Sequence, residues 1–209
     1  MNENFKIINH PLISHKLTIL RNKETSTLDF RNNVIEITRL LSYEVFKNID
    51  LEQIEIETPI AKTIGYKLKN QINLFPILRA GQGMVDGVTS LIPNAKIGHI
   101  GLYRDKKTLM PVKYLFKTPD IHDDDLSVVL DPILATGGSL LEAIKILKEA
   151  SVKKVIVIAI LTSKQAIESI QSKFPDLPIY VAAMDDTLNE DGYIVPGLGD
   201  AGDRIFGTK

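Results

Sequence analysis

Apolar runs alternate with amphipathic stretches from about residue 72 onward. The runs INLFPIL, AKIGHIGLYR, LSVVLD, KKVIVIAIL and LPIYVAAM predict strands at 72–78, 95–104, 126–131, 153–161 and 177–184. Between them, apolar residues recur at helical spacing over 140–147 and 163–174, and a turn at 79–87 leads into a third helix. This alternation predicts an α/β fold with a mostly parallel sheet flanked by helices. No linker-like or repeated segment interrupts it, which predicts one domain over residues 1–209.

The N-terminal quarter of the chain follows a less regular pattern. Residues 1–24 are mixed, with His10–Pro11 and Ser14–His15 in a polar setting that favours turns. Ser26 and Asp29 form a capping-box-like start for an N-terminal helix that extends to about residue 47. We expect this helix to pack on the body of the fold or on a second subunit.

Two further segments predict short strands outside the regular alternation. The stretch 54–68 alternates only until Pro59, which predicts a short strand or sheet edge followed by a turn. The run LMPVKYLFKTP lies between charged segments and predicts a strand pair, a β-arm near 104–118.

Composition and charge narrow the class of protein. The 209 residues carry a net charge of −1, which gives no electrostatic case for nucleic acid or membrane as a partner. The chain has no cysteine, so disulfides, a thiol nucleophile and thiolate metal sites are excluded. The start of the chain lacks a signal-peptide pattern and no apolar run is long enough to span a membrane, so we expect a cytoplasmic protein. The four histidines show no metal-ligand spacing.

The strongest chemical signal is a strand that ends on Asp131 and is followed by Thr136, Gly137, Gly138 and Ser139 before a helix. Glycines let the backbone approach a phosphate, and the free N–H groups of a helix start point at the anion. The turn has no lysine before Ser or Thr, and its glycines are adjacent, so it matches neither a Walker A loop nor a dinucleotide loop. An acid before such a turn suits ribose hydroxyls beside a phosphate. The alternative is an ordinary turn with Ser139 as N-cap.

Basic residues follow two other strands of the predicted sheet. Ligands of such sheets bind beyond the carboxyl ends of the strands, where Arg79 and Arg104 are expected. Arginine binds phosphate oxygens through two parallel hydrogen bonds. Arg104 with Lys106 and Lys107 forms either a solvated hairpin tip or a basic loop that closes over a polyphosphate. Gly81–Gln82–Gly83 alone is weak support for a dinucleotide site.

The C-terminal segment DGYIVPGLGDAGDRIFGTK is rich in glycine but retains apolar anchors. A glycine-rich backbone between apolar residues suits a flat, uncharged heterocycle that main-chain N–H and C=O groups recognise. The alternative is an ordered tail docked on a subunit interface.

Both long motifs resemble one known family. VVLDPILATGGS resembles the phosphoribosyl-diphosphate loop of type I phosphoribosyltransferases, in the form found in the uracil phosphoribosyltransferase family. YIVPGLGDAGDRIFGTK is similar to the uracil-binding segment of that family, and PILRAG, HIGLYRD and HPLISHKLTILRNKETST are similar to further stretches of it. Together these segments extend over nearly the whole chain.

The resemblance implies transfer of a phosphoribosyl group from 5-phospho-α-D-ribose 1-diphosphate to uracil, giving UMP and diphosphate in pyrimidine salvage. It implies Mg²⁺ bound through the diphosphate rather than through protein side chains, a homodimer or homotetramer, and GTP as a candidate allosteric ligand. Asp200 and Arg104 are implied as catalytic, and Ile194, Gly199, Asp200 and Ala201 as the uracil site. The residues implied for phosphoribosyl diphosphate are Arg79, Arg104, Asp131, Pro132, Ile133, Leu134, Ala135, Thr136, Gly137, Gly138, Ser139 and Asp200.

Two positions depart from the family pattern, and two other functions stay open. Gln82 stands where leucine is expected and Ile133 where methionine is expected; both are placed near the site, where they affect affinity rather than the reaction. Proteins of this fold also serve as nucleotide-sensing regulators that bind RNA, but the chain has no basic stripe. A transferase for another base is the third possibility.

Overall fold

The computed structural model describes residues 2–104 and 111–208. Nine strands of these residues form the central sheet, in the order β1-β11-β10-β8-β4-β6-β7, with β5 beside β4 and β9 beside β10. All neighbours pair parallel except β6 and β7, which are antiparallel. The strands are β1 (Phe5–Ile7), β4 (Ile72–Leu78), β5 (Lys96–Ile97), β6 (His99–Arg104), β7 (Pro111–Lys117), β8 (Leu126–Leu130), β9 (Ile133–Leu134), β10 (Lys154–Ser163) and β11 (Ile179–Asp185).

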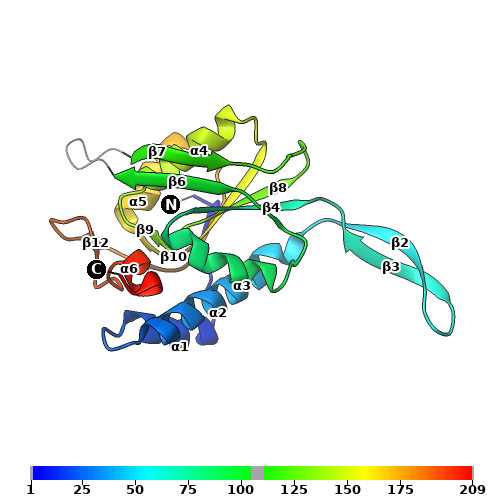
Figure 1. Cartoon of the computed structure of the whole chain (residues 1–209), viewed down its shortest axis with the longest axis horizontal. Coiled ribbons are helices and arrows are strands. Elements are labelled where there is room, and N and C mark those ends of the chain that lie inside the picture. The colour runs from blue at the N-terminus through cyan, green and yellow to red at the C-terminus, as the bar shows by residue number, and fades with distance from the viewer. Residues whose placement is uncertain (1, 105–110, 209) are drawn as a thin grey trace.

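Helices cover both faces of this sheet (Figure 1). One face packs against α1 (Pro11–Arg21), α2 (Thr27–Val45), α3 (Val85–Thr89) and α6 (Ala201–Phe206), and the other against α4 (Gly138–Glu149) and α5 (Lys164–Lys173). Short 3-10 turns lie at η1 (Phe46–Asn48) and η2 (Ala80–Met84). The predicted α/β class with a flanked, mostly parallel sheet is confirmed.

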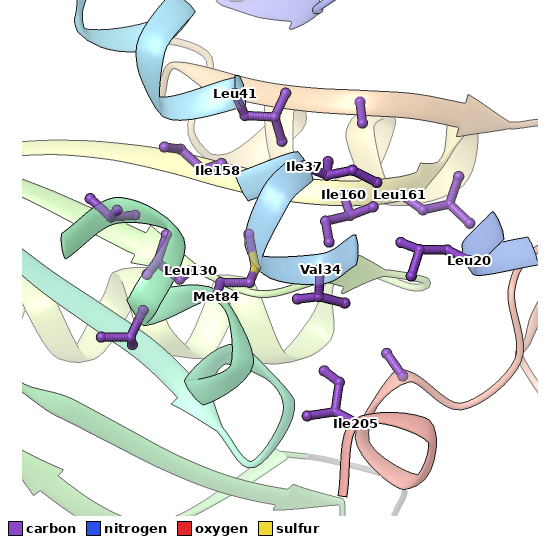
Figure 2. Packing of buried hydrophobic residues seen from close by; sticks show 14 of the residues in the cluster. Leu20, Val34, Ile37, Leu41, Met84, Leu130, Ile158, Ile160, Leu161 and Ile205 are labelled. Atoms are coloured by element: carbon purple, nitrogen blue, oxygen red, sulfur yellow. The ribbon is translucent and has the colours of Figure 1, made fainter. Parts of the chain in front are cut away.

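The central strand β10 shows why the sheet is buried on both faces. Successive side chains of a strand point to opposite faces, and here both faces meet apolar helices. Ile158 and Ile160 pack in the core under α2, whereas Val157 and Ala159 pack in the core under α4 and α5. Figure 2 shows the first of these cores, with Ile37 of α2 beside β10.

Residues 11–21 form helix α1, so the turn-prone character expected at His10–Pro11 and Ser14–His15 was wrong. Proline suits the first position of a helix, where its missing N–H has no partner to lose. The Nδ1 atom of His10 accepts a hydrogen bond of 3.1 Å from the Leu12 N–H and caps the helix. The predicted N-terminal helical segment is confirmed at α2, where Ser26 Oγ accepts from the Asp29 N–H at 3.1 Å.

The short strand expected before Pro59 is one half of an antiparallel hairpin. Strands β2 (Leu51–Glu57) and β3 (Lys62–Leu68) pair along their full length. The turn between them is closed by a hydrogen bond of 3.0 Å from the Thr58 N–H to the Ala61 carbonyl. The hairpin projects away from the sheet and its helices (Figure 1).

The strand pair predicted near 104–118 lies at the edge of the central sheet. β7 pairs with β6 from His99↔Lys117 to Arg104↔Pro111. Lys106 and Lys107, predicted to lie in a basic loop, are outside the described residues. No helix in the described part of the chain has the length and apolar character needed to cross a membrane.

Candidate active site

Three predicted site segments meet at one rim of the sheet. Strands β4, β8 and β10 are parallel, so their carboxyl ends lie at the same edge. Arg79 follows β4 and Asp131 follows β8. The C-terminal segment reaches the same rim, where Ala201 and Gly202 line a cavity together with Leu161 of β10.

That cavity, called the base cavity below, has a volume of about 310 Å³. All four residues predicted to read the base line it: Ile194, Gly199, Asp200 and Ala201. Small and apolar side chains from strand ends and turns also line it, namely Ala80, Ile133, Ala135 and Leu161. A cavity that combines apolar side chains with a glycine-rich backbone is a typical site for a small heterocycle.

A second hollow of about 130 Å³, called the loop hollow below, lies in the turn before α4. Asp131 and Ile133 to Leu140 line it, so it includes every predicted loop residue except Pro132. Pro132 is buried beneath the loop, and its carbonyl accepts hydrogen bonds from the N–H groups of Ile160 at 3.1 Å and Leu161 at 3.0 Å. Pro132 therefore anchors the loop rather than lining it.

Gly137 sets the start of helix α4. It is the N-cap and has φ +81°, a left-handed conformation that side chains rarely adopt. A Cβ atom at this position would also lie 3.2 Å from Cγ1 of Ile170. Because the helix begins at Gly138, the alternative reading with Ser139 as N-cap is wrong. Ser139 is instead exposed in the first helical turn.

Asp131 has an unusual charge state for an aspartate. The residue is partly exposed in the loop hollow. The surrounding protein removes enough water from its carboxyl group to raise its pKa to about 7. A hydrogen bond of 3.4 Å from the Ile133 N–H acts in the opposite direction. Near neutral pH, Asp131 can therefore exist as an acid or as a carboxylate.

Arg79 lies at the rim in contact with the C-terminal residues. Its Nη2 donates to Asp203 Oδ1 at 3.2 Å and its Nη1 to Thr208 Oγ1 at 3.4 Å, while the guanidinium lies 5.8 Å from the ring centre of Phe206. The hydroxyl of Thr208 and then the guanidinium of Arg79 hold the pKa of Asp203 below its usual range. With 58% of its side chain exposed, Arg79 is accessible to an anion.

Asp200 lines the base cavity and lies near Arg79. It caps helix α6, because its Oδ1 accepts from the Asp203 N–H at 2.8 Å. A Cβ atom at Gly202 would lie 3.2 Å from Asp200 Oδ1 and 3.8 Å from Arg79 Nη2, so the two side chains flank the same glycine.

Arg104, the other predicted arginine, ends strand β6. β6 pairs with β4 through Ile77↔Ile100 and Leu78↔Gly101, which places the end of β6 on the same rim as Arg79. The Arg104 side chain is outside the described residues.

The two departures from the family pattern occupy different places. Ile133 lines both the base cavity and the loop hollow. Gln82 lines neither: its Oε1 lies 3.2 Å from His99 Nε2, and it borders a separate groove with Arg31 and Phe206. Of the two residues predicted to lie near the site, only Ile133 lines it.

The sequence did not predict three charged residues that hold residues 194–201, called the base segment below. Arg21 and Asp185 pair with each other and both bond Gly197, and Arg204 donates to the Leu198 carbonyl at 2.7 Å. Arg21 and Arg204 could have been singled out because both lie within segments that resemble the uracil phosphoribosyltransferase family. No pattern in the sequence connected Asp185 to either.

Comparison with known proteins gives a consistent result over nearly the full chain. The family model described as uracil phosphoribosyltransferase matches residues 7–208. Uracil phosphoribosyltransferases of Ureaplasma urealyticum and Streptococcus suis are 56% and 52% identical over 206 residues, which are 98% of this chain and 99% of each relative. A solved protein structure from Aquifex aeolicus superposes with a TM-score of 0.92 at 36% identity, covering 97% of both chains. Adenine phosphoribosyltransferase of Trypanosoma brucei shares the fold, with a TM-score of 0.60 at 11% identity over 92% of this chain and 88% of that one.

Proposed function

The chain belongs to the uracil phosphoribosyltransferase family, and from this premise we propose that it converts uracil and 5-phospho-α-D-ribose 1-diphosphate to UMP and diphosphate. It would thus act as a pentosyltransferase of pyrimidine salvage. The observation that carries the proposal is that the base cavity and the loop hollow share Ile133 and Ala135 as a common wall. A base and a phosphorylated ribose bound there would be neighbours.

The base cavity supports a small pyrimidine as the acceptor. Recognition of uracil requires donors and acceptors in its plane, which the backbone of Gly199, Asp200 and Ala201 can supply. Ile194 is buried and gives the ring an apolar contact. Residues Arg79 and 131–139 then accommodate the second substrate.

The loop hollow supports binding of the ribose 5′-phosphate. The first N–H groups of α4, a helix of 12 residues, have no partner within the helix and favour an anion. The hydroxyl groups of Thr136 and Ser139 add hydrogen-bonding capacity at the same place. The ionised form of Asp131 would accept hydrogen bonds from the ribose hydroxyls.

The proposed reaction needs positioning and electrostatics but no protein nucleophile. The bond from C1′ to the diphosphate oxygen breaks, and a bond from C1′ to the uracil nitrogen forms on the opposite face while that nitrogen loses its proton. Arg79 and Arg104 would stabilise negative charge on the departing diphosphate. Asp200, which lines the base cavity near Arg79, would offset positive charge that develops on the ribose.

A magnesium ion is expected to enter the site with the substrate rather than to be held by protein side chains. Within 2–104 and 111–208, no three histidine or acidic side chains are grouped to hold a metal. Mg²⁺ commonly binds through substrate phosphates with few protein ligands. When bound, it would neutralise charge on the diphosphate.

The direct test is to incubate the protein with Mg²⁺, phosphoribosyl diphosphate and one of uracil, cytosine, hypoxanthine or adenine, with and without GTP. We expect UMP from uracil and no nucleotide from the other bases. Absence of UMP under both conditions would refute the proposal, and a nucleotide from another base would reassign the acceptor. A dependence on GTP would identify it as an allosteric activator.

The β2–β3 hairpin supports the further proposal of a homodimer or homotetramer. It exposes apolar side chains on both strands and at the turn, including Leu51, Ile60, Ile64 and Tyr66. An isolated two-stranded hairpin is at best marginally stable in water. Its projection from the body (Figure 1) and its apolar surface favour burial against another copy of the chain.

A further inference from the structure

One residue of the base segment (residues 194–201), Gly197, is held through both its N–H and its carbonyl group by an ion pair. Arg21, the last residue of α1, donates to Asp185 through two parallel hydrogen bonds of 2.7 Å. The same guanidinium donates to the Gly197 carbonyl at 2.8 Å. Asp185 in turn accepts from the Gly197 N–H at 3.0 Å.

This ion pair is well shielded from solvent. The side chain of Arg21 is 25% exposed and that of Asp185 is 10% exposed. Hydrogen bonds from Arg21 hold the pKa of Asp185 below its usual range. A shielded ion pair often adds little net stability relative to apolar side chains, because both charges lose water. Its distinctive contribution here is the fixed geometry that it imposes on Gly197.

The backbone at position 197 requires glycine. Its φ is +62°, and a Cβ atom at this position would lie 2.0 Å from the Ile194 carbonyl oxygen. Ile194 before it and Leu198 after it both line the base cavity. A displacement of Gly197 would therefore move both of these lining residues.

Arg204 provides a second connection between the same segments. Its Nη1 donates to the Leu198 carbonyl at 2.7 Å and its Nη2 to the Asn22 carbonyl at 2.6 Å. Its guanidinium also lies 4.3 Å from the ring centre of Phe30. The end of α1 and the base segment are thus joined at two successive residues, Gly197 and Leu198.

We propose that Arg21 is a positioning residue for base recognition, acting through Asp185 and Gly197. Neither Arg21 nor Asp185 lines the base cavity, so neither would contact a base bound there. The pair fixes the main chain between Ile194 and Gly199, on which a fit to uracil depends. The proposal rests on the function proposed above. It adds Arg21, which is separated from its partner Asp185 by 164 positions in the chain, to the residues that determine uracil binding.

The test compares Arg21→Lys, Arg21→Ala and Asp185→Asn with the wild-type enzyme. We expect the KM for uracil to rise about tenfold or more in Arg21→Ala, the size associated with a lost hydrogen bond to a charged group. The KM for phosphoribosyl diphosphate and kcat at saturating uracil should stay within about twofold of wild type. Arg21→Lys, which keeps the charge but cannot form both bonds, should recover part of the loss.

Lys16→Ala is the matched control on the same helix. Lys16 forms an ion pair with Glu36 of α2 and does not contact the base segment. This variant should lower the melting temperature without raising the KM for uracil. Equal increases in both KM values, or an unchanged KM for uracil in folded Arg21→Lys and Asp185→Asn, would overturn the proposal. Wild-type protein that makes no UMP would instead refute the proposed function.

Discussion

Asp131 connects the chemistry of the loop to pH. Its carboxyl group has a pKa of about 7 because burial disfavours the charged form. The carboxylate accepts hydrogen bonds from the ribose hydroxyls on both of its oxygens, whereas the protonated group carries a donor on one of them and binds the two hydroxyls less well. We therefore expect kcat/KM for phosphoribosyl diphosphate to fall as the pH is lowered through about 7.

Initial rates at low phosphoribosyl diphosphate between about pH 6 and 9 would measure this effect. Asp131→Asn should be less active throughout and should lose the part of the pH dependence that Asp131 contributes. The phosphate groups of the substrate titrate equally in both proteins, so comparing them isolates the side chain. An identical pH profile in the variant would show that Asp131 does not control binding.

The same pKa predicts how Asp131 affects stability. The folded-state pKa, about 7, is raised above the ordinary value of 3.8, so folding favours the protonated form. The associated stability is present below pH 3.8 and is lost as the pH rises through about 7. Asp131→Asn, which cannot ionise, should therefore raise the melting temperature at about pH 8 more than at about pH 5. Calorimetry without substrates at both pH values would test this, and an equal effect at both would contradict it.

Asp200 can be tested without disturbing the helix that it caps. Asparagine is about as good an N-cap as aspartate, so Asp200→Asn should keep α6 and its melting temperature. The variant loses the negative charge beside the proposed reacting centre, and we expect kcat to fall at least about tenfold. Steady-state kinetics and circular dichroism provide the two measurements. Unchanged turnover would remove Asp200 from the mechanism.

At the residue scale, the sequence predicted local chemistry but not distant partners. Asp131 and Gly137 lie in one short motif, where strand, turn and helix follow directly along the chain. The bond between Arg21 and Asp185 depends on how α1 and β11 pack, which no local pattern encodes. The roles predicted for individual residues in binding stay predictions.

At the element scale, periodicity identified elements with one consistently buried face and missed the others. Helix α2 buries Phe30, Val34, Ile37 and Leu41 at helical spacing and was predicted. Helix α1 buries only Ile13, Leu17 and Leu20 and begins at a proline, so its pattern was too short to recognise. The second hairpin strand was missed because its apolar residues are exposed rather than alternately buried.

The β2–β3 hairpin can be tested as a subunit interface, because its apolar residues face solvent in a single copy of the chain. Replacing Ile64, which is 52% exposed, and Tyr66, which is 63% exposed, with lysine should weaken association without affecting the core. Sedimentation velocity should show a smaller species than wild type at the same concentration. Lys62→Ala, on the same strand, is the matched control and should leave the assembly intact. An unchanged assembly in the double variant would exclude the hairpin as its interface.

At the scale of the whole molecule, parallel strands bring together residues that are far apart in the sequence. The rule that ligands bind beyond strand ends correctly predicted one rim for Arg79, Asp131 and the C-terminal segment. The rule cannot predict that the two hollows share a wall, because this depends on where the side chains of Ile133 and Ala135 lie. The extent of the domain and the cytoplasmic location remain predictions.

The binding rim at the carboxyl ends of the strands consists of segments from both halves of the chain. Substrate binding there should therefore stabilise the entire fold. Phosphoribosyl diphosphate with Mg²⁺ at about 100 times its Kd should add about 2.7 kcal/mol to the free energy of unfolding. For a protein of this size, that corresponds to an increase in melting temperature of about 5–10 °C. If the ion binds through the diphosphate, a chelator should abolish most of this increase without changing the melting temperature of the free protein. A chelator effect on the free protein would instead indicate a metal held by the protein itself, since a ligand that binds only the folded state stabilises it even without substrate.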